Sequence, residues 1–474
     1  MGSPNVENDI RQEDTIAAIS TPMGEGGIGV VRLSGATAID ILGQMFQNPG
    51  GGPRDYFDSR RVYYGHIVAA DGAKIDEVLA TVMRGPATYT REDVVEISCH
   101  GGSAILKKAL RRALELGARM AQPGEFSKRA FLNGRIDLVQ AEAVIDLIRS
   151  KSERAWKTAF SQLDGKLSRK LNRIEDQLVD VLSQLEVSID FPDEELEIAT
   201  NEAVIEKLSA VKAHVSELVS SYTMGRIFRD GVAVVIVGRP NVGKSSLMNA
   251  LLEKDRVIVT PIPGTTRDTI EEALEISGFA VRIIDTAGVR HTTDPAEIIG
   301  AERAMEAAHE ADVVLALIDA SVPLTAEDEE LLDRLAGLKA SSGAYLIAVA
   351  NKSDLPQQAD LEQLATITGA EVVHVSALTG AGLSDIRRGI IRGIDTLGET
   401  LSESAPITRE RHREKLQAMS ASIDAAVEAL RAGLGREYVA ADLRDAKEAM
   451  EELTGKALDA SVIEKIFSDF CIGK

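Results

Sequence analysis

Short apolar or alternating runs occupy the first 130 residues. They predict strands at residues 15–20, 28–33, 61–68 and 94–98. A helical spacing follows at residues 104–116. This mixture of strands with a helix predicts a compact α/β domain, which we expect to extend over residues 1–130.

From residue 131 the apolar positions recur at alternating steps of three and four, the spacing of long packed helices. The first stripes contain Leu167, Leu171, Ile174 and Leu178, then Val204, Leu208, Val211, Val215 and Leu218. The spacing returns near the C-terminus at Leu416, Ile423 and Leu430 and at Leu443, Met450 and Leu453. We expect one helical domain, residues 131–228 plus 398–474, interrupted by an insertion at residues 229–397. Two independent bundles are the alternative.

Length and composition fit about three domains in which helices pack on parallel sheets. The 474 residues include 39 glycines, and aromatic residues make up 4%. Apolar runs are too short to span a membrane, residues 1–13 lack a signal-peptide pattern, and two cysteines, Cys99 and Cys471, are too few for a disulfide framework. We therefore expect a cytoplasmic protein without membrane contact.

The formal net charge is −21, which disfavours tight RNA binding by the chain alone. A basic partner is therefore expected to share that work. Basic residues cluster locally at Lys107, Lys108, Arg111 and Arg112 and at Lys166, Arg169, Lys170 and Arg173. At helical spacing we interpret these clusters first as solvated helix faces, and as nucleic-acid contacts only second.

A glycine-rich motif follows the first apolar strand of the insertion. Residues 238–245, Gly-Arg-Pro-Asn-Val-Gly-Lys-Ser, come directly after the apolar run 232–237 and before an expected helix. This arrangement is typical of a phosphate-binding loop, in which backbone N–H groups approach the phosphates. Lys244 would supply a positive charge to the terminal phosphates, and the Ser245 hydroxyl would ligate Mg²⁺.

Two further motifs have the character of nucleotide-sensing switches. Residues 264–268, Gly-Thr-Thr-Arg-Asp, lie in an irregular segment, and Thr266 is the expected second Mg²⁺ ligand. Residues 285–288, Asp-Thr-Ala-Gly, end the apolar run 279–284. The Asp285 carboxylate would hold a metal-bound water there, and the Gly288 N–H would sense the γ-phosphate.

The remaining motifs predict a guanine pocket. Asp354, in the Asn-Lys-Ser-Asp motif at 351–354, would accept hydrogen bonds from the guanine N1–H and amino group, a donor pair that adenine lacks. Ser376 and Ala377, after the apolar run 371–375, would add a backbone N–H. The expected site for GTP and GDP contains Asn241, Val242, Gly243, Lys244, Ser245, Ser246, Thr260, Pro261, Ile262, Pro263, Gly264, Thr265, Thr266, Asp285, Thr286, Ala287, Gly288, Asn351, Lys352, Asp354, Ser376 and Ala377.

Val289 follows the Asp-Xaa-Xaa-Gly element, where Ras-like GTPases carry the glutamine that orients the attacking water. Because an aliphatic side chain does not polarise water, another group must do so. Glu297 is the best nearby carboxylate, with Arg290 and His291 as rivals.

Charge that develops on the leaving phosphate needs a positive partner in the transition state. Arg267 in the first switch is one candidate. A bound monovalent cation is the other, and Asn241 offers it a side-chain oxygen. Residue chemistry leaves both alternatives open.

Five motifs outside the nucleotide site point to a family. They lie at residues 14–18 (Asp-Thr-Ile-Ala-Ala), 26–35 (Gly-Gly-Ile-Gly-Val-Val-Arg-Leu-Ser-Gly), 123–127 (Pro-Gly-Glu-Phe-Ser), 131–138 (Phe-Leu-Asn-Gly-Arg-Ile-Asp-Leu) and 471–474 (Cys-Ile-Gly-Lys). With these motifs the chain resembles the MnmE (TrmE) tRNA modification GTPases over essentially its whole length. The resemblance implies an N-terminal α/β domain for tetrahydrofolate binding and dimerisation, a discontinuous all-α domain and an inserted Ras-like P-loop GTPase domain.

The same resemblance implies ligands at matching positions. The implied potassium ligands are Asn241, Thr260, Ile262 and Thr265, and the implied Mg²⁺ ligands are Ser245 and Thr266. Potassium then replaces an arginine finger, Glu297 positions the water, and the GTPase domains pair across a dimer when GTP is bound. The implied contacts to 5-formyl- or 5,10-methylene-tetrahydrofolate are Arg32, Glu96, Arg135 and Lys474.

The implied function is a potassium-dependent GTPase, a homodimer that works with the FAD protein MnmG in a heterotetramer. Together they install an aminomethyl or carboxymethylaminomethyl group at C5 of the wobble uridine, position 34, of tRNA. We add the hypothesis that Cys471, on a short tail, takes a direct catalytic part. The alternatives are an RNA- or ribosome-binding switch of the Era type and an N-terminal domain that only dimerises. Cys99 and Arg91 stand where the family carries glycine.

Overall fold

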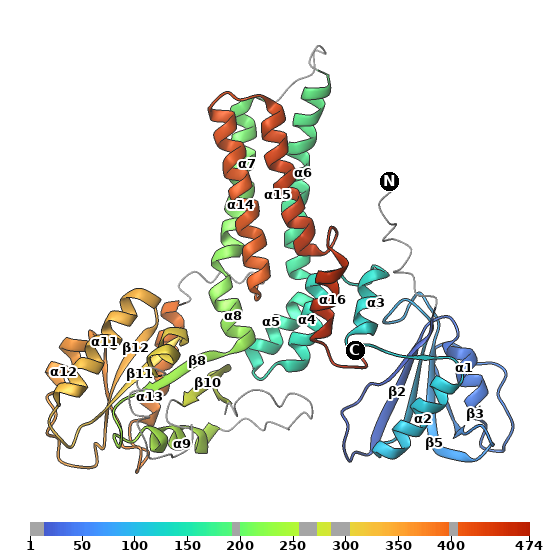
Figure 1. Cartoon of the computed structure of the whole chain (residues 1–474), viewed down its shortest axis with the longest axis horizontal. Helices are drawn as coiled ribbons and strands as arrows, with labels where there is room; N and C mark the ends of the chain where they lie inside the picture. The colour runs from blue at the N-terminus through green and yellow to red at the C-terminus, as the bar shows by residue number, and fades with distance from the viewer. Residues whose placement is uncertain (1–13, 192–199, 256–272, 286–303, 398–405) are drawn as a thin grey trace. The chain divides into compact units, whose positions relative to one another are not determined.

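The computed structural model describes residues 14–191, 200–255, 273–285, 304–397 and 406–474. These residues form two compact units (Figure 1). One unit contains residues 14–145 and Thr454–Lys474, and the other contains the described residues between 146 and 453. The C-terminal segment therefore belongs to the same unit as the N-terminal sheet, whereas the sequence-based boundary grouped all of residues 398–474 with the helical domain.

The N-terminal unit is built on a mixed sheet whose described strands have the order β3-β4-β5-β6-β2-β1-β7. The strands are β1 (Ile16–Ile19), β2 (Ile28–Ser34), β3 (Phe46–Gln47), β4 (Arg61–Val68), β5 (Lys74–Met83), β6 (Val94–His100) and β7 (Arg119–Met120). Helices α1 (Ala38–Met45) and α2 (Ser103–Glu115) cover one face and share its apolar core. Four predicted strands and the predicted helix are thereby confirmed, as β1, β2, β4, β6 and α2.

On strands β2, β5 and β6 the opposite face of this sheet carries polar or exposed side chains, whereas at β1 it is buried against Phe126. Arg32 on β2 is in register with Glu96 on β6, which in turn is in register with Thr81 on β5. Because side chains alternate between the two faces of a strand, these residues form one row across the sheet. Their neighbours in sequence, such as Val31 and Ile97, point into the helix-covered core.

The last residues of the chain pack on helix α3 (Glu125–Leu132). Helix α16 (Ala460–Ser468) contacts α3 through Phe467 and Phe131, whose ring centroids are 6.2 Å apart. The Gly124 N–H donates to the Cys471 carbonyl at 3.3 Å, and Pro123 forms a β-bridge with Ile472. These contacts return the C-terminal tail to the N-terminal sheet.

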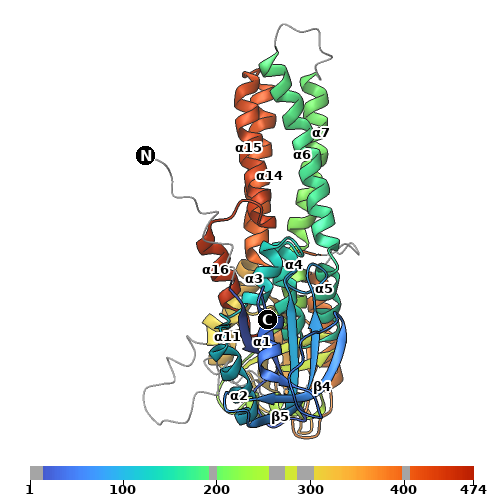
Figure 2. The same cartoon turned by 90° about the vertical axis from the view of Figure 1, so that its right-hand side faces the viewer.

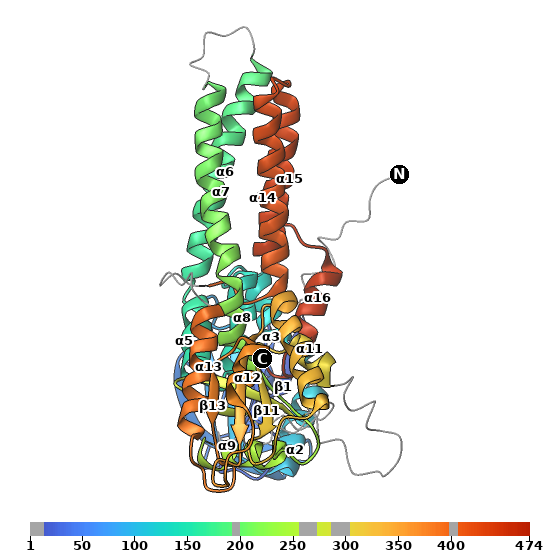
Figure 3. The same cartoon turned by 90° about the vertical axis from the view of Figure 1, so that its left-hand side faces the viewer.

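Helices from two separated segments form one bundle in the second unit. Its long helices α6 (Lys166–Asp190), α7 (Asn201–Ser220), α14 (Glu410–Arg431) and α15 (Arg436–Thr454) run side by side (Figures 2 and 3). The predicted stripes face inward, with Leu167, Leu171 and Leu178 fully buried. Arg444 on α15 pairs with Glu186 on α6 at 2.9 Å. The prediction of one interrupted helical domain is therefore confirmed, and the alternative of two bundles is wrong.

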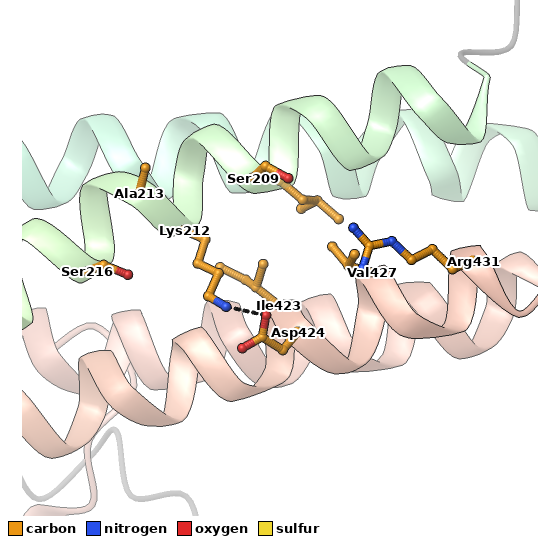
Figure 4. Close-up of a pocket in the computed structure, with 9 residues that line it drawn as sticks. Ser209, Lys212, Ala213, Ser216, Ile423, Asp424, Val427 and Arg431 are labelled. Carbon is orange, nitrogen blue, oxygen red and sulfur yellow. Dashed lines mark hydrogen bonds and ion pairs between the residues drawn. The ribbon is translucent and has the colours of Figure 1, made fainter.

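A groove of about 340 Å³ lies between α7 and α14 (Figure 4). Small side chains on α7, among them Ser209, Ala213 and Ser216, leave this space open. The Lys212 ammonium pairs with the Asp424 carboxylate across it. None of the predicted site residues lines the groove.

The insertion forms an α/β domain built on a sheet with six strands in its described part. Its described strands are β8 (Val232–Val237), β9 (Ala273–Ile276), β10 (Phe279–Asp285), β11 (Val313–Asp319), β12 (Tyr345–Asn351) and β13 (Val372–His374), in the order β13-β12-β11-β8-β10-β9. All neighbouring pairs are parallel except β9 with β10. Cores on both faces pack against α9 (Lys244–Asp255), α11 (Ala326–Ser342), α12 (Leu361–Thr368) and α13 (Leu383–Leu397). Loops at the carboxyl edge of such a sheet converge.

Short helices α5 (Glu153–Leu163) and α8 (Tyr222–Asp230) join the bundle to the inserted sheet. Arg226 on α8 pairs with Asp312, which also accepts a hydrogen bond from the Ala233 N–H at 2.8 Å. On α5, the Arg154 guanidinium lies 4.0 Å from the ring centroid of Phe279. Helix α4 (Leu138–Arg149) precedes α5. Among all the helices described, none has the length and apolar character needed to cross a membrane.

Gly124 allows the tail to pack, and we predict that Gly124→Ala loosens it. Its φ is +67°, and an added Cβ would lie 2.5 Å from the Phe467 carbonyl oxygen. Left-handed strain and this clash together cost about 1–3 kcal/mol. Hydrogen exchange of α16 amides, followed by mass spectrometry, should therefore accelerate about tenfold or more. Gly52→Ala is the matched control, because Gly52 has a φ of +87° in open space. Equal exchange in the two variants would contradict the prediction.

Candidate functional site

The phosphate-loop motif lies between buried strand β8 and helix α9, as the sequence predicts. Its backbone turns sharply, with φ of +65° at Asn241 and +102° at Gly243. A Cβ on Gly243 would lie 2.2 Å from the Asn351 Nδ2 atom, so only glycine fits this position. The loop thus presents backbone N–H groups and the start of α9, a favourable place for phosphate.

Polar side chains of the loop have the positions that nucleotide binding requires. The Lys244 ammonium donates to the carbonyls of Gly238 and Arg239, at 2.7 and 2.8 Å, and so lies across the loop. Ser245 and Ser246 are exposed in the first turn of α9, where a hydroxyl is available to a metal ion. Asn241 is exposed on the loop itself, while Val242 is buried beneath it.

The base-binding loops meet the phosphate loop through Asn351. This buried side chain ends β12, and its Nδ2 donates to the Val242 carbonyl at 2.8 Å. Its Oδ1 accepts a hydrogen bond from the Ala377 N–H at 3.1 Å. One amide therefore joins three of the predicted motifs. The Ala377 N–H, which we expected to face the base, already has a partner here.

The other base-site residues lie beside Asn351. The Asp354 carboxylate is exposed and accepts a hydrogen bond from the Ser376 hydroxyl at 2.6 Å. The φ of Lys352 is +65°, and its ammonium pairs with Asp319 at the end of β11. The carboxylate predicted to read guanine is thus oriented by one neighbour and open to solvent.

Several predicted site residues lie outside the described residues. They are Thr260, Pro261, Ile262, Pro263, Gly264, Thr265, Thr266, Thr286, Ala287, Gly288 and Glu297. For Asp285 only the backbone is described, paired in register with Ile236 at the end of β10. Val237 ends the neighbouring strand, so this register brings the Asp285 backbone to the edge that carries the phosphate loop.

Sequence reasoning missed three charged residues around the nucleotide loops. Arg239, within the phosphate motif, donates to Asp328 at 2.6 Å, and Asp328 also accepts from the Thr325 hydroxyl at 2.8 Å. Asp319 holds Lys352. Asp319 directly follows the apolar run of β11, as the recognised motifs follow theirs. The position of Asp319 at the end of an apolar run was therefore a sign of a site residue, although Asp319 belongs to no recognised motif.

A second cluster lies in the N-terminal unit, where three of the predicted folate residues meet. The Arg32 guanidinium pairs with Glu96 at 2.8 Å and donates to the Gly473 carbonyl at 3.2 Å. It also lies 5.7 Å from the ring centroid of Phe126. Burial lowers the pKa of the Lys474 ammonium, and the nearby Arg32 charge lowers it further. The terminal lysine therefore lies close to Arg32 without full compensation of its charge.

The other residues predicted in this unit lie nearby. Arg135 covers the ring of Tyr89 at 4.8 Å, and Tyr89 packs against the cluster that contains Phe126. Cys471 is exposed, and its carbonyl accepts hydrogen bonds from the N–H groups of Gly124 and Lys474. The structure brings Arg32, Glu96 and Lys474 together and places Arg135 on a neighbouring aromatic ring.

Cys99 and Arg91, the two residues that replace glycines of the family pattern, lie in different structural environments. Cys99 is buried in the core on the helix-covered side of the sheet, away from Glu96, and burial raises the pKa of its thiol to about 12. Arg91 has a φ of +64°, a conformation that favours glycine. Its guanidinium donates to the Asn133 carbonyl at 2.8 Å, which helps to hold it there.

The arrangement at the edge of the inserted sheet defines a class of protein. A phosphate loop, a buried asparagine and an exposed aspartate converge at the carboxyl ends of parallel strands. This is the site of a P-loop protein that binds guanine nucleotides. Here it is inserted into a helical bundle.

Comparisons with known proteins agree with this class. A family model for the MnmE helical domain matches residues 138–471, and one for the GTP-binding protein TrmE N-terminus matches residues 15–135. The chain therefore belongs to the MnmE (TrmE) family of tRNA modification GTPases.

Full-length relatives support the same membership. The tRNA modification GTPase MnmE of Symbiobacterium thermophilum is 45% identical over 463 residues, which cover 98% of this chain and all of that protein. The one of Alkaliphilus oremlandii is 42% identical over 464 residues, 98% of this chain and 99% of the relative. The G domain of the T. maritima FeoB iron transporter is 26% identical and covers 34% of this chain and 98% of that one, but its TM-score of 0.26 is too low to support a conclusion.

We predict that Asp354→Asn exchanges guanine specificity for xanthine. An amide presents a donor where the carboxylate accepts, and xanthine carries an oxygen in place of the guanine amino group. GDP affinity should fall about 100-fold or more, and affinity for xanthosine diphosphate should rise. Displacement of a fluorescent nucleotide measures both. Asp360→Asn at the N-cap of α12 makes the same charge change away from the site. Unchanged GDP affinity in Asp354→Asn would refute this assignment.

Proposed function

We propose that this chain is a potassium-stimulated GTPase that modifies the wobble uridine of tRNA as a homodimer and takes a one-carbon unit from a tetrahydrofolate derivative. The observation that carries the proposal is the presence of two separate polar sites in one chain. One is the nucleotide site joined by Asn351, and the other is the Arg32–Glu96–Lys474 cluster. A GTPase that acted only as a switch would need the first site alone.

The nucleotide site supports hydrolysis of GTP by the residues of its own loops. Lys244 lies across the phosphate loop, and Ser245 is exposed at the start of α9, as expected of a Mg²⁺ ligand. When bound, Mg²⁺ would neutralise charge on the phosphates. Val289 does not polarise water, so we assign the water-positioning role to Glu297, which lies outside the described residues.

Asn241 supports the use of a monovalent cation in place of an arginine finger. Its left-handed backbone holds the residue on the exposed side of the loop, where its side-chain oxygen is accessible. When bound there, potassium would supply positive charge beside the phosphates. The other proposed ligands, Thr260, Ile262 and Thr265, lie outside the described residues, as does the rival Arg267.

The cluster in the N-terminal unit has the chemistry of a folate site. The Glu96 carboxylate suits the donor-rich edge of a pterin, and the cations Arg32 and Lys474 suit a glutamate tail. The lowered pKa of Lys474 means that its charge lacks full compensation, so an anionic ligand would be favoured beside it. When bound, the tetrahydrofolate derivative would supply the one-carbon unit. Arg135 is the proposed fourth contact.

The open face of the N-terminal sheet supports a homodimer. Val62 is 61% exposed and Tyr64 is 51% exposed on β4, and Leu79 follows on β5 in register with Tyr64. These apolar side chains lie on the face that carries Arg32 and Glu96. A second copy that covered this face would bury them and would enclose the cluster.

We further propose a partnership with the FAD protein MnmG in a heterotetramer, which would install an aminomethyl or carboxymethylaminomethyl group at C5 of uridine 34. This part rests on family membership. The full-length relatives are named as tRNA modification GTPases. The cytoplasm stays the expected compartment, and a catalytic role for exposed Cys471 stays a hypothesis, which full tRNA modification by a Cys471→Ser variant would refute.

Potassium should accelerate GTP hydrolysis about tenfold or more over sodium at equal ionic strength, because a fixed cation offsets charge in the transition state. Asn241→Ala should lose most of this difference. Rates of phosphate release, measured at saturating GTP, give the comparison, and GDP affinity of the variant shows that the loop still folds. Equal rates in the two salts would exclude the cation mechanism.

Glu96→Gln should weaken binding of 5-formyltetrahydrofolate about tenfold or more, because a charge-assisted hydrogen bond is lost. Isothermal titration of the full chain measures this affinity. Glu115→Gln, at the end of α2, removes the same charge outside the cluster and should bind like the wild type. Absence of binding by the wild type would contradict the folate assignment.

A further inference from the structure

One stretch of the chain has a charge opposite to the rest. Residues 149–173 contain eight basic and two acidic residues, a net charge of +6. The whole chain has a net charge of −21, so the other residues carry −27. The stretch covers the end of α4, all of α5 and the first two turns of α6.

Part of this charge is free to meet a partner. Lys166 and Arg173 are exposed on α6, and neither has an acidic partner among the described residues. Arg169 lies on the same helix face, three residues after Lys166, and its guanidinium is 3.6 Å from the Asp164 carboxylate. The opposite face of α6, with Leu167 and Leu171, is buried in the bundle.

An exposed aromatic pair lies beside this basic face. Trp156 and Phe160 on α5 are 48% and 52% exposed, and their rings stack with centroids 5.9 Å apart. Trp156 is the single tryptophan of the chain. Two large aromatic side chains left together at a surface indicate a binding site.

The packing of α5 holds the pair outward. Small residues Ala155 and Ala159 are buried on the inner face, and the buried Gln162 donates to the Pro406 carbonyl at 2.7 Å. On another side, Arg154 contacts the inserted domain. The exposed rings are therefore set by the fold and do not arise from a loose helix.

Hydrogen bonds at the turn between α5 and α6 place the end of the helix that carries the aromatic pair next to the start of the basic face. The Asp164 N–H donates to the Phe160 carbonyl at 2.8 Å, and the Arg169 guanidinium donates to the Asp164 carbonyl at 2.8 Å. Phe160 and Arg169 thus flank the same residue, at the turn between the helices. We name Trp156, Phe160, Lys166, Arg169 and Arg173 the α5–α6 surface.

Stacked rings beside clustered cations match the chemistry of RNA with unpaired bases. Aromatic side chains stack on splayed bases, and Lys and Arg contact phosphates. Aromatic residues and arginine are also enriched in protein interfaces. The net charge of +6 over residues 149–173 favours a polyanion, which offers a phosphate at every nucleotide. A membrane surface would require an apolar helix face larger than two rings.

We propose that the α5–α6 surface binds an unpaired region of the tRNA, with Trp156 and Phe160 stacked on a base and the three cations on its phosphates. This inference rests on the proposed function in tRNA modification and adds the place of contact. Because Arg154, on the same short helix, contacts the β9–β10 turn, bound RNA would touch an element that joins the bundle to the nucleotide domain.

Binding of an unmodified tRNA transcript to the full-length protein tests the stacking. Trp156→Leu with Phe160→Leu should weaken affinity about 5- to 100-fold, since loss of one stacked base costs that much. Trp156→Phe, which keeps an aromatic ring, should retain most of the affinity. In the wild type, tRNA should quench tryptophan fluorescence, whereas heparin, a polyanion without bases, should quench it much less. Unchanged affinity of the double variant, or equal quenching by heparin, would overturn the proposal.

Salt dependence tests the cations. Lys166→Glu with Arg173→Glu should reduce the slope of log affinity against log salt by about two. The matched control is Lys107→Glu with Lys108→Glu on α2, an equal charge change at exposed residues outside the α5–α6 surface. Equal slopes in the two variants would overturn the proposal.

Potassium-stimulated GTP hydrolysis should be the same in all these variants as in the wild type. If the wild type itself showed no potassium stimulation, the proposed function would be contradicted, whereas the α5–α6 surface would not. A change in sedimentation of the free double variant with unchanged tRNA affinity would instead identify an interface between copies.

Discussion

The buried amide of Asn351 holds together loops that the sequence separates by more than a hundred residues. Its donor meets the phosphate loop at Val242, and its acceptor meets the Ala377 N–H. A buried amide needs partners for both ends, so neither loop is free to move without leaving a polar group unsatisfied. The close fit against Gly243 makes the contact specific for glycine on one side. The geometry of the nucleotide site depends on this single side chain.

The same domain is tied to the helical bundle by continuous backbone and by one shared carboxylate. Helix α8 leads through Gly231 directly into β8, which ends at the phosphate loop. Asp312 binds Arg226 of α8 and the N–H of Ala233 in β8. Because a nearly buried carboxylate joins helix and strand, movement at the phosphate loop would be carried to α8 as a displacement of packed elements. An insertion at this place therefore gives the nucleotide domain a direct packed connection to the bundle.

In the N-terminal unit, the polar cluster contains residues from both ends of the chain. Arg32 and Glu96 face each other across neighbouring strands, while Lys474 arrives from the last residue. The tail is held by backbone hydrogen bonds at Gly124 and by aromatic packing at Phe467. Two charged residues on a sheet would form an ordinary surface ion pair. Here the terminal Lys474 adds a third, partly buried charge beside the pair.

The sequence by itself determined the nucleotide loops, because each motif is a short stretch whose chemistry follows from its own residues and from the strand before it. The same holds for the helical stripes and for the strands whose apolar residues alternate. The family resemblance implied that Lys474 lies near Arg32, but tertiary structure alone decided that helix α16 packs on α3 and that Asn351 joins three loops. It also decided that Trp156 and Phe160 are exposed beside the basic face of α6. These facts depend on contacts between residues far apart in the chain, and periodicity and local motifs contain no information about such distances.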